Sequence, residues 1–356
     1  MILFTFANQN LHLMKNILLC CLMFAAVTAN SQNLIAVNHN GSSSFYTNID
    51  TAIIKAANGD TIYLPGGVFT LNTSISKELH IYGAGLHPDS AKTTTPTIII
   101  GNINLERGAS NGTLEGIYTQ NAIYLGAYGH SDTTKLNVKN YTISRCYLAH
   151  ITAYSFYNST YGLSFYDKSQ YITIAESILT SGVYMLSSNK NFLISNCIIS
   201  FYFSLYSSEI SNCIFTHNST SISGDNVLIK NCIAYGNSGT PSNSVAYNNV
   251  NPPYGNGYNG TLYLQGNFSA NWSDIFVSVP VGAREDYFKN DYHLKSNFAG
   301  KNYGTDGTDV GIYGGPFPWK EGNVPVNPHI YFKDIPQVTD NAGKLPVKIK
   351  VKAQTR

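Results

Sequence analysis

The sequence predicts an all-β solenoid, a chain wound into stacked parallel coils. A helix is expected to cover the first coil, and a β-hairpin tail to follow the last. A short unit recurs as Ile143-Ser-Arg-Cys146, Ile194-Ser-Asn-Cys197, Ile210-Ser-Asn-Cys213 and Ile229-Lys-Asn-Cys232. The last three copies start 16 and 19 residues apart, enough for three short strands and their bends, and such a repeat is typical of a solenoid. The residue before each of these last three Cys is Asn, which enters the left-handed backbone region easily.

Residues 1–31 are expected to be a signal peptide, with Met14 as an alternative start. Lys15 is followed by an apolar run at 17–27 and by the small residues of Ala29-Asn30-Ser31, as in secretory signals. The run is shorter than the roughly 20 residues of a membrane span. We therefore expect a protein that is secreted or held in the cell envelope, with no membrane span once the signal is removed.

Residues 32–59 are predicted to be an N-terminal cap. Its apolar residues fall at the spacing of one amphipathic helix, which would cover the open edge of the first coil. These residues are Phe45, Ile49, Ala52, Ile53, Ala56 and Ala57. The β-helix itself is expected over residues 60–275, starting with strands at 60–64 and 68–71 and carrying loops at 126–139 and 154–168.

Residues 276–325 are predicted to form irregular C-terminal coils and a cap, and residues 326–356 a β-hairpin tail. In the tail, Lys348, Lys350 and Lys352 alternate with Val347, Ile349 and Val351. This alternation indicates a half-buried strand with a solvated lysine face.

Stacking of the repeat predicts one inward column and one column of bends. The column would hold the first residue of each copy and of the looser copies at 114–117 and 174–177, namely Leu114, Ile143, Ile174, Ile194, Ile210 and Ile229. Asn196, Asn212 and Asn231 are expected to form a structural ladder of left-handed kinks whose side chains hydrogen-bond from coil to coil. Arg145 and Glu176 occupy the same kink and are expected to pair.

Four cysteines remain after the signal: Cys146, Cys197, Cys213 and Cys232. An even number in an exported protein allows disulfides. Equivalent positions in successive coils stand side by side rather than facing each other, which favours buried free thiols inside the structural ladder.

Together these features resemble the right-handed parallel β-helix of the pectin-lyase-like superfamily. Asp60-Thr-Ile-Tyr-Leu-Pro-Gly-Gly67 and His80-Ile-Tyr-Gly-Ala-Gly85 resemble the first coils of that family, and the Asn bends resemble its asparagine ladder. The stretch 291–315 and the final strand are similar to the tails of exported bacterial β-helix proteins of unassigned function. Lyases, hydrolases, esterases and non-catalytic adhesins share this fold, so the resemblance implies architecture rather than one activity.

A pectate-type lyase would need calcium and a basic residue beside the sugar. Arg145, Lys139 and Lys168 are the candidate bases, although an Arg145–Glu176 pair explains Arg145 without catalysis. The acids of the coils are scattered, whereas calcium takes about 6–8 oxygen ligands. No cofactor is therefore identified, and calcium remains open.

A polygalacturonase-type hydrolase would need paired carboxylates. The matching segment here offers Asp225 followed by Asn226, which favours a turn residue over a catalytic one. Asp306 and Asp309 are candidate cation ligands, but turn formation explains them equally.

Tyr154, Tyr157, Tyr161 and Tyr166 are candidates for stacking on sugars, because a phenol offers an apolar face with a polar tip. Only 12% of residues are charged and the net charge is +2, which argues against a nucleic-acid partner. The function predicted is a secreted β-helix protein that binds or acts on polysaccharide, without an identifiable catalytic set. The alternatives are the lyase and the hydrolase, and the oligomeric state stays open.

Overall fold

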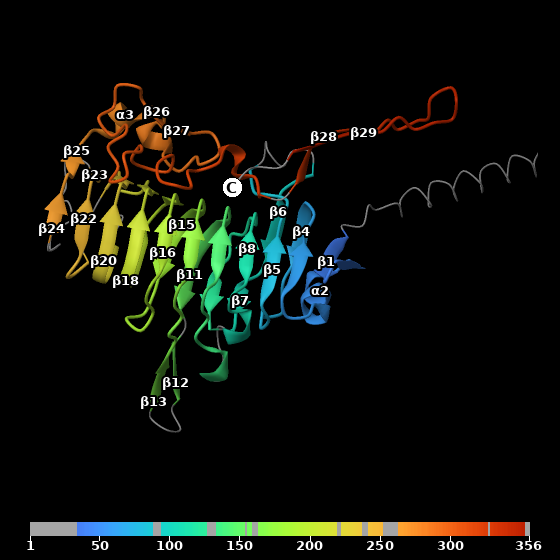
Figure 1. The fold of residues 1–356 in the computed structure, drawn as a ribbon, viewed down its shortest axis with the longest axis horizontal. Helices are drawn as coiled ribbons and strands as arrows, with labels where there is room; N and C mark the ends of the chain where they lie inside the picture. Colours follow the sequence, from blue (N-terminus) through green and yellow to red (C-terminus); the bar gives the residue numbers. More distant parts are fainter. Residues whose placement is uncertain are drawn as a thin grey trace, which may run out of the picture. The chain divides into compact units, whose positions relative to one another are not determined.

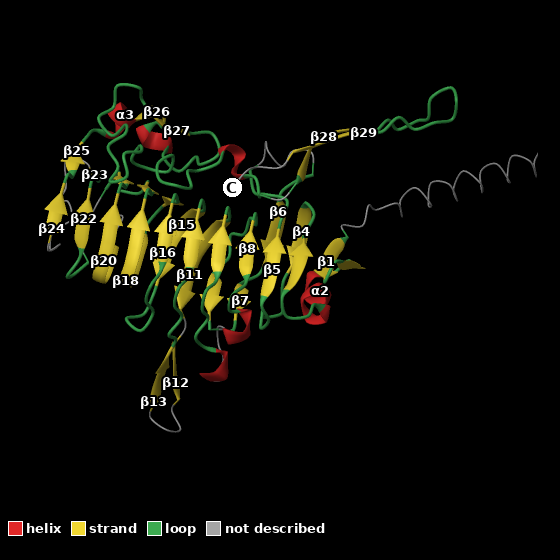
Figure 2. Ribbon diagram, in the orientation of Figure 1, coloured by secondary structure: helices red, strands yellow, loops and turns green. Residues whose placement is uncertain are grey.

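The computed structural model describes residues 34–87, 94–126, 133–153, 155–158, 163–218, 222–236, 241–251, 263–326 and 328–352. The expected signal peptide lies outside these residues. Figures 1 and 2 show strands stacked coil upon coil, with few helices. No helix of the described part is both long and apolar enough to cross a membrane.

The coils build three parallel sheets, each strand pairing with its counterpart one coil later. Such pairing between non-consecutive strands is what a solenoid requires. The first sheet contains β3 (Asp60–Tyr63), β5 (Leu79–Tyr82), β8 (Thr113–Glu115), β10 (Thr142–Ser144), β14 (Thr173–Ala175), β16 (Leu193–Ser195), the second halves of β18 (Tyr202–Ser211) and β20 (Ile222–Lys230), β22 (Val245–Tyr247) and β24 (Tyr263–Gln265).

The other two sheets follow the first around each coil. The second contains β4 (Gly67–Thr70), β6 (Thr97–Ile100), the starts of β11 (Tyr147–Ala153) and β15 (Ile178–Tyr184), β17 (Ile198–Ile199), β19 (Ile214–Phe215), β21 (Ile233–Ala234), β23 (Val250–Asn251) and β25 (Phe268–Ser269). The third contains β7 (Ile103–Leu105), β9 (Ile123–Leu125), the ends of β11 and β15, and the starts of β18 and β20.

The predicted inward column is confirmed, and it is longer than expected. Each member is buried and pairs in register with the next. The column comprises Ile62, Ile81, Leu114, Ile143, Ile174, Ile194, Ile210, Ile229 and Ala246. Crossovers between parallel strands are right-handed in nearly all proteins. The chain is therefore a right-handed parallel β-helix.

Two columns of left-handed residues bound the first sheet, five residues apart in each coil. The column after the strand, predicted from the repeat, contains Gly116, Arg145, Glu176, Asn196, Asn212 and Asn231, with φ from 47° to 71°. The column before the strand contains Asn111, Asn140, Tyr171, Asn191, Ser207 and Asn226, with φ from 46° to 67°. The second column was not predicted, because tyrosine and serine interrupt its asparagines.

The four coil thiols are buried and free, as predicted. They stack inside the corner between the first and second sheets. In later coils the same position is occupied by the polar residues Asn249 and Asn267. Asn249 Nδ2 donates to Asn267 Oδ1 at 2.9 Å. Hydrogen bonds between amide side chains of successive coils therefore exist one residue after the predicted kink. They also occur in the column before the strand, where Asn140 Nδ2 donates to Asn111 Oδ1 at 3.1 Å.

The N-terminal cap is a hairpin and a short helix. It consists of β1 (Ile35–His39), β2 (Ser42–Tyr46) and α2 (Ile49–Lys55), and β1 pairs antiparallel with β3, which covers the edge of the first coil. The prediction that Phe45 lies in the helix is wrong: it belongs to β2 and is 62% exposed. The hairpin turns at Asn40-Gly41, where both residues have positive φ. Such a pair is a turn signal, but the spacing of the apolar residues favoured a helix that included Phe45.

Two loops interrupt the coils at the predicted places. The 3₁₀ turns η1 (Arg107–Ala109) and η2 (Thr133–Lys135) contact each other beside the first loop. The second loop is a hairpin of β12 (Ser155–Asn158) and β13 (Leu163–Tyr166). The first sheet stays in register across both insertions, whereas the pairing of β11 with β15 shifts between Leu148 and His150.

Residues 270–326 do not add coils or close the end, as the sequence had predicted for 276–325. They pack against the outer face of the second sheet, and they contain α3 (Trp272–Ile275), β26 (Phe276–Ser278), η3 (Val281–Ala283), β27 (Asp291–Leu294) and η4 (Glu321–Asn323). The reason is the second sheet itself, whose outward residues are apolar and need cover.

The tail forms the predicted hairpin, in which β28 (His329–Asp334) pairs antiparallel with β29 (Lys348–Lys352). The expectation of a half-buried strand is wrong, since Ile349 and Val351 are 51% and 58% exposed. The alternation of lysine with apolar residues therefore sets two exposed faces rather than an inside and an outside.

Candidate functional site

Residues 300–326, here called the strap, lie along the corner formed by the kink after the first sheet. Asn248 Nδ2 donates to the carbonyl oxygen of Tyr303 at 2.7 Å, and Asn231 Oδ1 accepts from the backbone N–H of Thr305 at 2.9 Å. The strap runs against the order of the coils, so that later strap residues meet earlier coils.

The next two ladder asparagines continue the same pattern. Asn212 Nδ2 lies 3.4 Å from the carbonyl oxygens of Asp309 and Gly311. Asn196 Nδ2 donates to the carbonyl oxygens of Ile312 and Gly314, both at 2.8 Å. The prediction that these side chains bond from coil to coil is therefore wrong: their amides hold the strap, because a kink turns them outward.

Below the strap, the second sheet presents an outward apolar column. Ile178, Ile198, Ile214, Ile233 and Val250 are buried under it and belong to one cluster with strap and neighbouring residues such as Val310 and Ile312. Burial of apolar surface stabilises a fold by about 25 cal/mol per Å². The burial of this column therefore holds the strap against the second sheet. Each Cys-Ile-Ile or Cys-Ile-Phe unit thus buries side chains on both faces of its strand.

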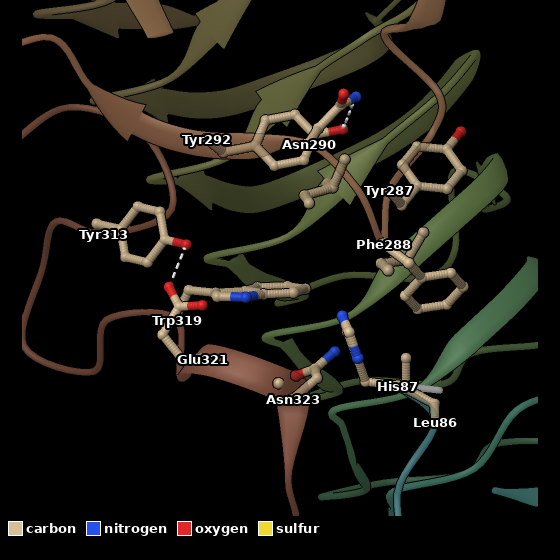
Figure 3. Close-up of a pocket in the computed structure, with 13 residues that line it drawn as sticks. Leu86, His87, Tyr287, Phe288, Asn290, Tyr292, Tyr313, Trp319, Glu321 and Asn323 are labelled. Carbon is tan, nitrogen blue, oxygen red and sulfur yellow. Dashed lines mark hydrogen bonds between the residues drawn. The ribbon is translucent and has the colours of Figure 1, made fainter. Parts of the chain in front are cut away.

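A pocket of about 100 Å³ lies where the strap, residues 287–292 and the second sheet meet (Figure 3). Its aromatic walls are Tyr287, Phe288, Tyr292, Tyr313 and Trp319. Leu86, Ile178 and Ile198 add apolar surface, and His87, Asn290, Glu321 and Asn323 are polar. Most of the lining residues are aromatic or aliphatic, whereas most of the surface that the pocket exposes belongs to polar atoms.

Ring contacts fix the walls. The Phe288 ring stacks on Tyr147 at 5.8 Å and meets His87 edge-on at 5.2 Å. His293 stacks on Tyr313 with centroids 3.8 Å apart. The aromatic surfaces are therefore held in place before any ligand arrives, which lowers the cost of ordering them on binding.

Most of the polar groups are also held. Tyr292 Oη donates to the carbonyl oxygen of Arg284 at 2.8 Å and accepts from Asn290 Nδ2 at 3.3 Å. Tyr313 Oη donates to Glu321 Oε1 at 2.6 Å, as Figure 3 shows. Burial, with Glu321 adding to it, raises the pKa of Tyr313, so its hydroxyl remains a donor at neutral pH.

Asn323 is the exception. It is 1% exposed, and neither Oδ1 nor Nδ2 has a hydrogen-bond partner among the described residues. Its φ of 48° lies in the left-handed region, in which Asn is one of the tolerated residues. An unpaired buried amide costs about 1–3 kcal/mol, so this side chain fits a ligand that offers both a donor and an acceptor.

The candidate bases Arg145, Lys139 and Lys168 do not line this pocket, and the structure does not bring them together. Arg145 is 5% exposed. Its guanidinium binds both oxygens of Glu176 at 3.0 and 3.1 Å, and Glu115 at 3.2 Å. The expected Arg145–Glu176 pair is confirmed. Glu115 also accepts from the backbone N–H of Val326 at 2.8 Å, so this buried triad anchors the end of the strap.

Lys139 and Lys168 are exposed and lie at a different corner. Lys139 precedes β10 and Arg145 follows it, so a whole strand separates the two side chains. The backbone N–H of Lys168 donates to Asn137 Oδ1 at 2.7 Å. Asp225 accepts from Asn243 Nδ2 at 2.8 Å, in keeping with a residue that shapes a bend.

Asp306 and Asp309 both shape turns of the strap. Asp306 accepts from Thr308 Oγ1 at 2.7 Å, and Asp309 pairs with Lys301 Nζ at 2.9 Å. Among the described residues, no three or more His, Cys, Asp or Glu side chains converge as a metal site would require. Tyr154 and Tyr161, and the side chains of Tyr157 and Tyr166, lie outside what the structure describes.

The pocket was missed because its residues are spread from Leu86 to Asn323. Residue spacing within one segment does not predict which distant segments will pack together, and the strap brings these walls together from several segments. The available signals were Trp319, one of 2 tryptophans in the chain, and the Glu321-Gly-Asn323 sequence with its turn-forming pair. Both occur in the part that the repeat does not reach.

No family model and no curated protein matches this chain. Among solved structures, the chain is similar to a pectin methylesterase from Aspergillus niger in deglycosylated form. The identity is 12%, the match covers 76% of this chain and 92% of that chain, and the TM-score is 0.33. The assignment of the β-helix rests on the strand registers given above.

Proposed function

We propose that this protein is a carbohydrate-binding β-helix, which takes one sugar residue of a polysaccharide into the pocket under the strap. The observation that carries the proposal is the buried amide of Asn323, unpaired among the described residues, in an aromatic-walled pocket. A side-chain amide donates through Nδ2 and accepts through Oδ1. Adjacent sugar hydroxyls offer the complementary acceptor and donor.

The aromatic walls suit the other face of a sugar. Trp319, Tyr313 and Phe288 present ring surface, and the C–H face of a pyranose is apolar. Rigid aromatic side chains supply contact area at low entropic cost. The predicted signal peptide, if cleaved as expected, would bring such a protein outside the cell or into its envelope, where polysaccharide is present.

The lining favours binding over catalysis. Among the described residues that line the pocket, Glu321 is the one acidic residue, and none is lysine or arginine. Glycoside hydrolysis uses two carboxylates, and lyase chemistry would use a basic residue. Arg145, the strongest candidate base in the sequence, is bound to two carboxylates in the buried triad.

Intrinsic tryptophan fluorescence tests the proposal. The two tryptophans are separable: Trp319 lines the pocket, while Trp272 is buried in α3 with Nε1 donating to Val279. Neutral, amino and acidic monosaccharides and short oligosaccharides would be titrated into the protein. We expect a saturable signal that persists in Trp272→Phe and disappears in Trp319→Phe.

Asn323→Gly should weaken binding by about thirtyfold, because two hydrogen bonds at roughly 1 kcal/mol each are lost. Glycine keeps the left-handed backbone. Asn302→Gly is the matched control, since Asn302 also lies in the strap with positive φ and is exposed. A sugar that binds both variants as it binds the parent, or no sugar binding at all, would refute the proposal.

A further inference from the structure

The charges around the pocket indicate which sugars it takes. Glu321 is the acidic residue of the lining, and its side chain is 74% exposed at the pocket mouth. Tyr313 and His293 both approach Oε1, at 2.6 and 3.7 Å. Oε2 has no partner among the described residues, which leaves a carboxylate oxygen available to a ligand.

Of the nearby cationic groups, His293 approaches Glu321 itself at 3.7 Å, whereas Lys289 and Arg284 are held by other groups. Lys289 pairs with Asp286 at 2.9 Å, and His293 Nδ1 lies 2.8 Å from Asp291. Arg284 lies over the Tyr235 ring at 3.5 Å. Lys289 and Arg284 are therefore engaged on the outer side, while Lys320 precedes Glu321 in the chain without lining the pocket.

The tyrosines of the walls experience the same acidic surroundings. Burial raises the pKa of Tyr287 to about 12, with Glu285 contributing. Burial also raises the pKa of Tyr292, with Asp286 and Glu285 contributing. Glu285 and Asp286 therefore add negative potential behind these two walls, where the tyrosine hydroxyls bind Ser200 and the carbonyl oxygen of Arg284.

We infer that the pocket selects amino sugars over neutral sugars, and neutral sugars over uronic acids, through pairing of the ligand ammonium with Glu321. This inference rests on the proposed function and specifies its ligand class. A uronic acid would bring a second carboxylate toward Glu321 with no lysine or arginine in the lining to neutralise it. An ammonium group would meet a free carboxylate oxygen at the mouth, while Asn323 binds ring hydroxyls deeper in the pocket.

The test uses two matched series, each with an amino sugar, a neutral sugar and a uronic acid. The first series is glucosamine, glucose and glucuronic acid; the second is galactosamine, galactose and galacturonic acid. Binding is followed by Trp319 fluorescence in Trp272→Phe at pH 6.5 and low salt. We expect the amine to bind about threefold tighter than the neutral sugar of its series, a size typical of exposed ion pairs. The acid should bind more weakly than the neutral sugar, and salt should narrow both differences.

Glu321→Gln should remove the amine preference while the neutral sugar still binds. Glu209→Gln is the control, because Glu209 pairs with Lys230 on the first sheet, outside the pocket lining. If a uronic acid binds as well as its neutral counterpart, or Glu321→Gln retains the preference, the inference is wrong although the proposed function stands. If no sugar of either series changes Trp319 fluorescence, the proposed function itself fails.

Discussion

The side-chain amide of Asn196 donates to the carbonyl oxygen of Ile312 at 2.8 Å, across 116 residues of sequence. The kink that directs this amide outward belongs to the coil repeat, and the carbonyl belongs to the strap. The bond therefore joins the repetitive part of the chain to the non-repetitive part. The pocket depends on that junction, since Trp319 and Asn323 follow directly along the strap.

Asn196→Ala should destabilise the protein by about 2–3 kcal/mol. Two hydrogen bonds to the strap are lost, and alanine at a φ of 52° adds about 1 kcal/mol of strain. Asn196→Gly should cost less, because glycine tolerates this backbone. Asn212→Gly should cost least, since its bonds are longer at 3.4 Å. Urea unfolding that gives one value for all three variants would contradict this ranking.

Arg145→Met should cost about 3–5 kcal/mol at pH 7, because Glu115 and Glu176 would remain buried without their partner. The triple variant with Glu115→Gln and Glu176→Gln should regain much of the stability. A triple variant that is no more stable than Arg145→Met would show that Arg145 acts through packing alone.

The coil thiols predict a loss of stability in alkali. Burial raises the pKa of Cys146 to about 12, while an unfolded thiol ionises near 8.5. The folded state then holds its proton more tightly, so this contribution is complete below about pH 8.5 and declines as the pH rises toward 12. The free energy of unfolding, measured from pH 8 to 11, should fall less steeply in Cys146→Ala.

Thiol chemistry provides a second check on the same residues. All four coil cysteines are buried and free, and burial raises the pKa of Cys213 well above its ordinary value. A chromogenic disulfide reagent should therefore leave them unmodified in the native protein and react with all four in denaturant. Rapid reaction of any coil thiol in the native state would mean that the corner is open.

The outward column of the second sheet can be tested by truncation. Ile214→Ala should destabilise by about 2–5 kcal/mol, because Ile214 is fully buried beneath the C-terminal residues. Val68→Ala, also in a strand but 57% exposed, should change stability by less than about 0.5 kcal/mol. Similar small effects at both positions would show that the strap does not cover this sheet.

The repeat was sufficient to predict the coil, its inward column and its kink, because each coil repeats the same local choice. Ile143, Ile194 and Ile229 are equivalent by spacing and need no knowledge of distant segments. The preceding column of kinks was missed at Tyr171 and Ser207, where neighbouring coils impose a backbone that the residue type does not favour. Stacking supplies that information, and spacing does not.

The candidate site lay beyond such reasoning for a different reason. Trp319 and Asn323 acquire their surroundings only when the strap docks against coils formed some 100 to 200 residues earlier. Arg145 was more predictable, since its pairing with Glu176 was expected from their shared kink position and only Glu115 was missed. The sequence predicted the pairing of Arg145 with Glu176 but not its pairing with Glu115.

The central claim is that a sugar ring occupies the pocket and pairs with Asn323. A high-resolution crystal structure of the protein grown with glucosamine tests it most directly. We expect ring density against Trp319, with hydroxyl oxygens at hydrogen-bonding distance from both Asn323 Oδ1 and Nδ2. Ordered water alone on that amide, at a glucosamine concentration that saturates the fluorescence change, would contradict the account.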